Sequence, residues 1–207
     1  MAAALIGGAG AVLSAGSAEA ATDCGARISW TDWVGGHALT CGDKQFTWKS
    51  TIAIGDLASS TVSAIEPLSG IYLFNLDLPD FTRTPFDFTY TASITDPHKA
   101  FSVVDLDSDA VPIANPPSIL TATFIGGSSD VTLTSTNGST DAKDVFGRPT
   151  ILHVNNVYNG NGAIDSIENS YQQVDKVPGP LPILGAGVAF GFSRKLRRRI
   201  QGDHVKA

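Results

Sequence analysis

The sequence predicts an all-β protein whose body is a single antiparallel β-sandwich. Apolar and polar side chains alternate with a period of two along most of the central region. Clusters of Gly, Pro, Asn and Asp separate these segments, and no convincing amphipathic helix interrupts them. Short strands at this spacing are typical of two packed antiparallel sheets, and a body of about 155 residues suffices for one core.

The clearest predicted strand spans Phe86 to Thr95, where apolar side chains alternate with Asp, Thr and Ser. The same alternation predicts three further sets of inward-facing residues: Phe46, Trp48, Ile52 and Ile54; Leu120, Ala122 and Phe124; Val131 and Leu133. Four more strands are expected at residues 71–78, 100–106, 150–157 and 170–175. Two glycines and two serines within residues 125–131 predict a hairpin connection.

The first residues of the chain predict export. Residues 1–13 are rich in Ala and Gly and carry no charge, and Ala18-Glu19-Ala20 fits a small-x-small cleavage site. We therefore expect a signal peptide over residues 1–20, removed by signal peptidase. No Lys or Arg precedes the apolar region, so we expect the true start to lie upstream of Met1. A core strand or helix is the alternative, and the local glycines disfavour it.

Two cysteines, Cys24 and Cys41, follow the predicted cleavage site. In an oxidising compartment they would close a loop of about 18 residues, which stabilises a fold by about 3 kcal/mol in the chain-entropy model. Two free thiols or half of a metal site are the alternatives. A metal is disfavoured because the spacing is not Cys-x-x-Cys and His37 is the only histidine nearby.

The body between the two termini is acidic. From Asp23 to Lys176 the chain carries eight Lys and Arg against 18 Asp and Glu, a formal charge of −10. Such a surface disfavours nucleic acid and anionic lipid as partners of the body. It favours solubility and loose association with cations.

The C-terminal segment combines three features of a membrane sorting signal. It begins with Val177, Pro178, Gly179 and Pro180, continues with a short apolar run, and ends in five basic residues: Arg194, Lys195, Arg197, Arg198 and Arg199. As a helix, residues 181–192 would be about 18 Å long against roughly 30 Å of bilayer hydrocarbon, which is too short for a permanent transmembrane helix. The basic block predicts a cytoplasmic C-terminus. A buried helix followed by a solvated basic patch is the alternative.

These residues resemble the PEP-CTERM sorting domain of exported bacterial proteins, in its cyanobacterial form. Val177, Pro178 and Pro180 match the family motif, and Gly179 stands where the family has Glu. The resemblance implies that an exosortase, a membrane-embedded cysteine peptidase, cleaves the tail during export. It also implies transient membrane anchoring and a mature protein at the cell surface or in the extracellular matrix, in contact with exopolysaccharide.

Catalytic motifs are not found in the sequence. The chain lacks a Gly-x-Ser-x-Gly elbow, a Gly-x-x-x-x-Gly-Lys-Ser/Thr loop and a His-Glu-x-x-His motif. His37, His98 and His153 fall on different predicted elements, so no triad can be assembled from the sequence. We therefore expect a protein that is not an enzyme and that has no cofactor.

Asp105, Asp107 and Asp109 form the sharpest polar cluster. Carboxylates at positions one, three and five suit a calcium loop, but the Gly and Glu that an EF-hand requires at positions six and twelve are absent. These residues are therefore weak metal candidates. In a strand they would share one solvent-facing side with Phe101 and Val103.

Trp30, Trp33 and Trp48 lie close to the cysteines in the sequence and suggest a carbohydrate-stacking platform. Trp30 and Trp33 are three residues apart, so in a strand they would point to opposite sides. Packing over the disulfide is the commoner role of such side chains. Pairs such as Thr132 and Thr134 could suggest an ice-binding array, but strand propensity explains them.

Three functions are therefore considered. The leading expectation is an exported, non-enzymatic protein of the cell surface or matrix. A secreted carbohydrate- or calcium-binding sandwich is the alternative, and an extracellular hydrolase is the third. The predicted organisation is a signal peptide over residues 1–20, a sandwich over 21–176, and a sorting segment with a short apolar helix over 177–200.

Overall fold

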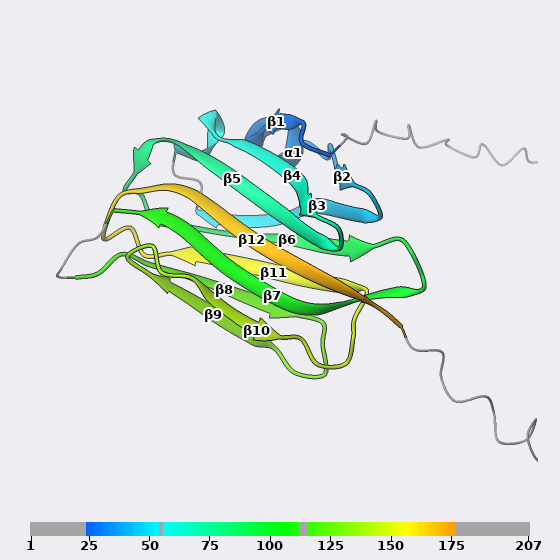
Figure 1. Ribbon diagram of the computed structural model, residues 1–207. Coiled ribbons are helices and arrows are strands. Elements are labelled where there is room, and N and C mark those ends of the chain that lie inside the picture. The colour runs from blue at the N-terminus through cyan, green and yellow to red at the C-terminus, as the bar shows by residue number, and fades with distance from the viewer. Residues whose placement is uncertain (1–23, 54–55, 112–115, 177–207) are drawn as a thin grey trace, which may run out of the picture. The chain divides into compact units, whose positions relative to one another are not determined.

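Two antiparallel β-sheets face each other in the computed structural model and enclose the core between them, which confirms the predicted sandwich (Figure 1). The structure describes residues 24–53, 56–111 and 116–176. The predicted signal peptide, sorting motif, apolar run and basic block lie outside these residues. Within the described part of the chain, no helix is long and apolar enough to cross a membrane.

Each sheet contains six strands. The first sheet consists, in spatial order, of β1 (Arg27–Ser29), β4 (Thr61–Leu68), β5 (Ile71–Thr82), β12 (Ile164–Asp175), β7 (Lys99–Ala110) and β10 (Asp141–Asp144). The second consists of β2 (Leu39–Cys41), β3 (Lys44–Ala53), β6 (Phe86–Ile94), β11 (Ile151–Tyr158), β8 (Ile119–Ile125) and β9 (Val131–Thr136). Two short helices, α1 (Trp30–Val34) and η1 (Asp56–Ser59), complete the fold.

Strand alternation places the apolar side chains as the sequence predicts. In β6 every second residue from Phe86 to Ile94 is buried, and the hydroxyl-bearing residues between them face outward. The predicted hairpin is confirmed, because β8 and β9 pair antiparallel with Phe124 opposite Val131. Two register shifts in β3, after Trp48 and after Thr51, interrupt the simple alternation that was expected there.

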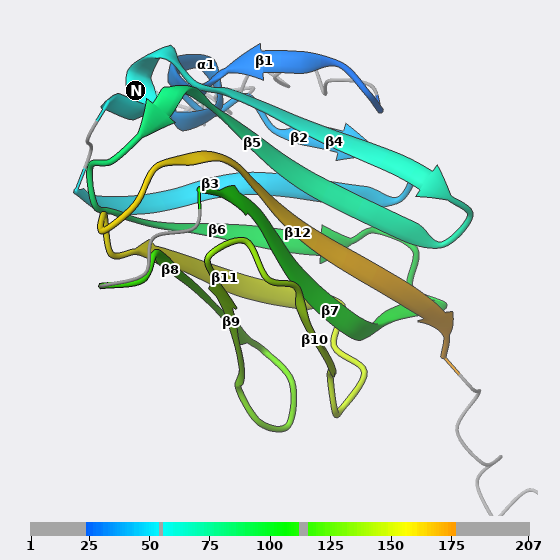
Figure 2. The same cartoon turned by 60° about the vertical axis from the view of Figure 1, so that its left-hand side comes forward.

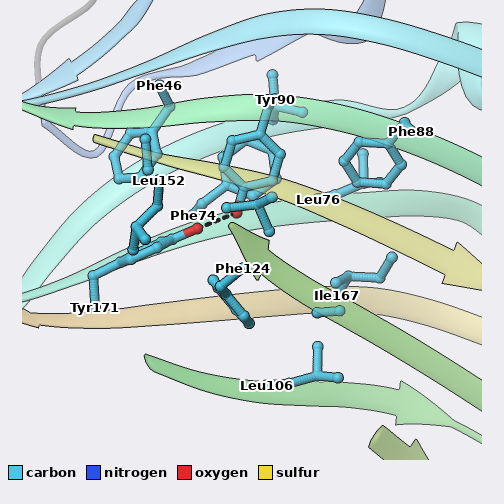
Figure 3. Close-up of a cluster of buried hydrophobic side chains, with 14 of the residues drawn as sticks. Phe46, Phe74, Leu76, Phe88, Tyr90, Leu106, Phe124, Leu152, Ile167 and Tyr171 are labelled. Atoms are coloured by element: carbon cyan, nitrogen blue, oxygen red, sulfur yellow. Dashed lines mark hydrogen bonds between the residues drawn. The ribbon is translucent and has the colours of Figure 1, made fainter. Parts of the chain in front are cut away.

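Aromatic side chains from both sheets fill the centre of the core (Figure 3). The rings of Phe74 and Tyr90 stack with centroids 4.3 Å apart, and Phe46 lies 5.6 Å from Tyr171. Burying each such side chain contributes about 1.5–3 kcal/mol relative to exposing it. These contacts bring β5 and β12 of the first sheet against β3 and β6 of the second.

A buried polar network also crosses the core. The hydroxyls of Tyr90 and Tyr171 share a hydrogen bond, drawn as a dashed line in Figure 3. Nearby, the side-chain Nδ2 of Asn169 donates to the side-chain Oδ1 of Asn156 at 3.1 Å. Burial raises the pKa of both tyrosines, so their hydroxyls remain protonated donors. Each of these two hydrogen bonds joins one sheet to the other, so the network favours one alignment of the sheets.

Trp30 and Trp33 lie in a helix, so the placement on opposite sides that a strand would give them does not occur. The Ser29 hydroxyl caps α1 by accepting a hydrogen bond from the Asp32 amide at 3.1 Å. Residues three apart share one face of a helix, so Trp30 and Trp33 both point into the core. The disulfide between Cys24 and Cys41 is confirmed.

Four strands carry too little sequence pattern to be predicted: β1, β2, β4 and β10. The first two have only three residues each, and β10 contains no large apolar side chain. These strands form because their neighbours supply hydrogen-bond partners, as β7 does for β10. Together β9 and β10, the last strands of the two sheets, lie side by side at one edge of the sandwich (Figure 2).

Candidate functional site

The three predicted histidine candidates stand on separate elements. His37 follows α1, His98 lies in the β6–β7 connection, and His153 is on β11. The His153 Nδ1 is 3.0 Å from the Thr91 hydroxyl on the outer face of the second sheet. No group of three or more His, Cys, Asp or Glu residues that could hold a metal is present among the described residues.

The tryptophans do not form a sugar platform. Trp30 and Trp33 are 2% and 0% exposed, and their rings contact each other at 5.3 Å. Trp48 is partly buried and packs against the same core. Buried rings cannot stack on a ligand, so Trp30 and Trp33 provide no carbohydrate platform.

The three aspartates lie on the outer face of β7, as expected for a strand. Asp109 accepts a hydrogen bond from the Ser166 hydroxyl at 3.0 Å, and Asp105 receives a longer one from Ser170. The expectation that Phe101 shares their face is wrong, because Phe101 is fully buried. Partial burial, followed by repulsion from Asp107, raises the pKa of Asp105.

An open groove lies where the last strands of the two sheets meet, and we call it the β9–β10 groove. It has a volume of about 590 Å³. Its lining combines one exposed aromatic ring, three charged side chains, two hydroxyls and small apolar groups: Val103, Ser129, Asp130, Val131, Thr132, Ala142, Lys143, Asp144 and Phe146. Apolar and polar groups of this kind suit a ligand that presents both a flat face and hydroxyl groups.

Phe146 is the aromatic side chain of this groove, and it is 63% exposed. The neighbouring Val145 is buried and anchors the segment, and its amide donates to the Ser102 carbonyl at 2.8 Å. The Phe146 carbonyl accepts from the Ser128 amide at 2.9 Å. These hydrogen bonds fix the backbone, and the Phe146 ring is left exposed to solvent instead of packing in the core.

Close approach of two backbone segments holds this geometry. A Cβ at Gly127 would lie 2.6 Å from the Phe146 carbonyl oxygen, so a side chain there would push the two loops apart. Gly147 adopts a φ of 88°, a conformation that glycine reaches without strain. The backbone of the β8–β9 connection thus packs closely against the segment after β10.

The polar groups of the groove differ in whether they already have partners within the protein. Lys143 donates to the Thr132 carbonyl at 2.6 Å and lies 3.9 Å from the Asp141 carboxylate. Asp130 and Asp144 are exposed and have no ion pair within the described ranges. Their carboxylates remain available as acceptors for a ligand.

A second hollow of about 270 Å³ adjoins the groove and shares Val103 and Ala142 with it. It lies on the outer face of the first sheet and adds the polar side chains of Asp105, Ser170 and Gln172. The two hollows therefore lie next to each other on the surface.

Sequence reasoning missed Phe146. It follows a short polar strand and precedes Gly-Arg-Pro, so it belongs to no alternating apolar pattern. An aromatic residue isolated in a loop in this way is the signal that could have identified it.

Comparisons with known proteins add little to this description. No protein-family model matches the chain, and neither does any curated protein. Among solved structures, TmCBM61 in complex with β-1,4-galactotriose is 6% identical with a TM-score of 0.32, covering 56% of this chain and 88% of its own. The mannan-recognising carbohydrate-binding module TmCBM27 is 10% identical with a TM-score of 0.34, covering 64% and 89%. Similarity this low assigns no ligand to the present chain.

Proposed function

We propose that this β-sandwich is a non-catalytic carbohydrate-binding module that acts outside the cell, with the β9–β10 groove as its binding site. The observation that carries the proposal is the exposed Phe146 ring beside a groove with carboxylates and hydroxyls. The apolar face of a sugar ring packs on an aromatic side chain. Its hydroxyls form hydrogen bonds with groups such as Asp130 and Asp144.

The charge of the body narrows the ligand class. With a formal charge of −10 over the body, polyanionic polysaccharides would be repelled. Neutral polysaccharides and those carrying amino groups are therefore the expected ligands. The groove is open and the second hollow continues it, which suits a linear polymer bound along its length and not a single enclosed sugar.

Export would bring the module to such ligands. The disulfide between Cys24 and Cys41 fits an oxidising compartment. We propose that the signal peptide directs export and that an exosortase processes the PEP-CTERM-like segment that begins at Val177. The mature protein would then reside at the cell surface or in the matrix, where it binds exopolysaccharide.

Binding measurements with a Phe146→Ala variant test the site. The purified protein is titrated with a neutral galactan, a neutral mannan, chitosan and the anionic polymer alginate. The wild-type protein is expected to bind at least one of the first three and not alginate, and Phe146→Ala to weaken that binding about tenfold, or roughly 1.4 kcal/mol. Ile151→Ala, which truncates another half-exposed apolar residue outside the groove lining, is the matched control.

Two results would overturn the proposal. One is the absence of binding to every neutral or amino polysaccharide tested. The other is equal affinity of the wild-type protein and the Phe146→Ala variant, which would place binding outside the groove.

Deletion of the chain from Val177 onward tests delivery separately. We expect the truncated protein to appear in the medium or to remain unprocessed, whereas the full chain is cell-associated during sorting. Identical cell association of both forms would exclude the sorting role. Mass spectrometry of the two ends of the mature protein would locate both cleavages.

A further inference from the structure

Lys44 is a buried cation placed where the two sheets meet. It opens β3 of the second sheet, directly opposite Cys41 of the disulfide. Its side chain has no exposed surface. The Nζ atom contacts the Asp43 carboxylate and the Gln173 carboxamide oxygen, and it lies 4.1 Å from the centre of the Tyr72 ring. We call this group the Lys44 corner.

Burial makes the Lys44 ammonium easier to deprotonate. Removal from water lowers the pKa of the amine, although the neighbouring Asp43 carboxylate opposes that shift. A neutral amine carries the lone pair that makes lysine a nucleophile. The buried position of Lys44 therefore favours a nucleophilic role for its amine.

Gln173 reaches this amine from the other sheet. It lies on β12, and its backbone amide donates to the Gly70 carbonyl at 3.0 Å, which fixes the strand at this point. The neighbouring Gln172 is exposed and lines the second hollow, so the two glutamines have opposite surroundings. An amine, a carboxamide and a carboxylate thus converge in a partly buried corner, held by strands that are far apart in sequence.

We propose that Lys44 and Gln173 join through an intramolecular isopeptide bond that ties the two sheets together. In this reaction Asp43 accepts a proton from the lysine ammonium, and the Nζ lone pair then attacks the Gln173 Cδ. The C=O electrons move onto Oε1 to give a tetrahedral intermediate. Asp43 next returns its proton to the amide nitrogen, the Cδ–Nε2 bond breaks, and the carbonyl re-forms as one ammonia leaves with the remaining proton.

The reaction balances without any further reagent. An amine and a primary amide become a secondary amide and ammonia, no atom changes oxidation state, and all the reacting groups belong to this chain. Proximity supplies the catalytic advantage, because binding both groups in one rigid site replaces an encounter in solution. Placed beside the disulfide, the bond would add a second covalent link at this edge of the sandwich.

Peptide mapping tests the bond directly. The full chain is produced with export so that the disulfide forms, then reduced, denatured and digested with trypsin. We expect the peptide that contains Lys44, uncleaved at that residue, joined to the peptide that ends at Lys176, with a combined mass lower by one ammonia. Cleavage after Lys44, together with recovery of the peptide that ends at Lys176 at its unmodified mass, would overturn the proposal.

Variants identify the reacting groups. Lys44→Met and Gln173→Ala are each expected to abolish the linked peptide, and Asp43→Asn to reduce its yield at a fixed time after synthesis. Gln172→Ala is the matched control on the same strand and should retain the link in full. Because the wild-type digest is informative by itself, a variant that fails to fold does not leave the question open. The bond does not involve the β9–β10 groove, so either proposal can fail while the other holds.

Discussion

The Lys44 corner and the β9–β10 groove lie at different edges of the second sheet. They differ in whether their polar side chains are buried with partners or exposed without them. In the corner, the Lys44 amine is fully buried and surrounded by an aromatic ring and two polar partners. In the groove, an aromatic ring is exposed and two carboxylates are left without an ion pair in the described part of the chain. Buried groups with partners hold the structure, and exposed groups without them remain available to a ligand. Stability and binding should therefore respond to different mutations.

Two phenylalanines provide the largest test of this contrast. Phe74 is fully buried and stacks on Tyr90, so Phe74→Ala is expected to lower the free energy of unfolding by about 3–5 kcal/mol. Phe146→Ala should change it by less than about 0.5 kcal/mol, because its ring is already in water. Urea denaturation followed by tryptophan fluorescence measures both values. Comparable losses would mean that Phe146 contributes to the core.

The disulfide is expected to have the next largest effect. Cys24→Ser removes the cross-link at its exposed end and leaves no cavity, so the loss should reflect the freed chain, about 3 kcal/mol. Urea midpoints with and without reductant provide the control, since reduced wild-type protein should match the variant. Glycan binding in the groove should be unchanged under conditions where both proteins are folded. A weakened affinity would show that the two regions are coupled.

Much of the sandwich could be predicted because most of its strands bury one face only. The alternation from Phe86 to Ile94 survives in the structure residue by residue. Where a strand is short or polar, as in β10, it is positioned by its neighbours, and its own side chains carry no signal. Trp30 and Trp33 illustrate a different ambiguity, because a spacing of three fits opposite strand faces and equally one helix face. The capping serine, Ser29, was the local signal that separates the two.

The groove could not be predicted for a physical reason. Its residues come from β7, β9, β10 and the loops beside them, and only folding brings these segments together. The same holds for Gln173, which reaches Lys44 across 129 positions of sequence. By contrast, the disulfide was predictable because the chain has only two cysteines. The signal peptide and the sorting segment remain predictions, since they lie outside the described residues.

A smaller effect is expected at the loop that supports Phe146. Gly127→Ala would place a methyl group 2.6 Å from the Phe146 carbonyl oxygen and 3.2 Å from the Val145 side chain. Relief of this overlap must move one of the two loops, which should cost about 1–2 kcal/mol in unfolding free energy and also weaken glycan binding. Ser128→Ala, which adds no atoms to the same loop, is the control. If Gly127→Ala binds like the wild-type protein, the position of Phe146 does not determine affinity.

The smallest expected effect lies on the acidic face that continues the groove. Partial burial and then the charge of Asp107 raise the pKa of Asp105, so the folded chain holds this proton over the acidic interval between the unfolded and folded pKa values. Folding is then less favourable as pH rises through that interval, because the unfolded chain has already released the proton. Asp105→Asn should therefore stabilise the protein at neutral pH, by less than about 1 kcal/mol since the site is partly solvated. The gain should shrink as pH falls and Asp105 becomes protonated in the wild-type protein. Thermal unfolding across this pH range measures the gain in stability. Asp109→Asn, at an exposed position on the same strand, is the control. An equal gain for both variants would mean that general repulsion among the aspartates of β7 outweighs the burial of Asp105.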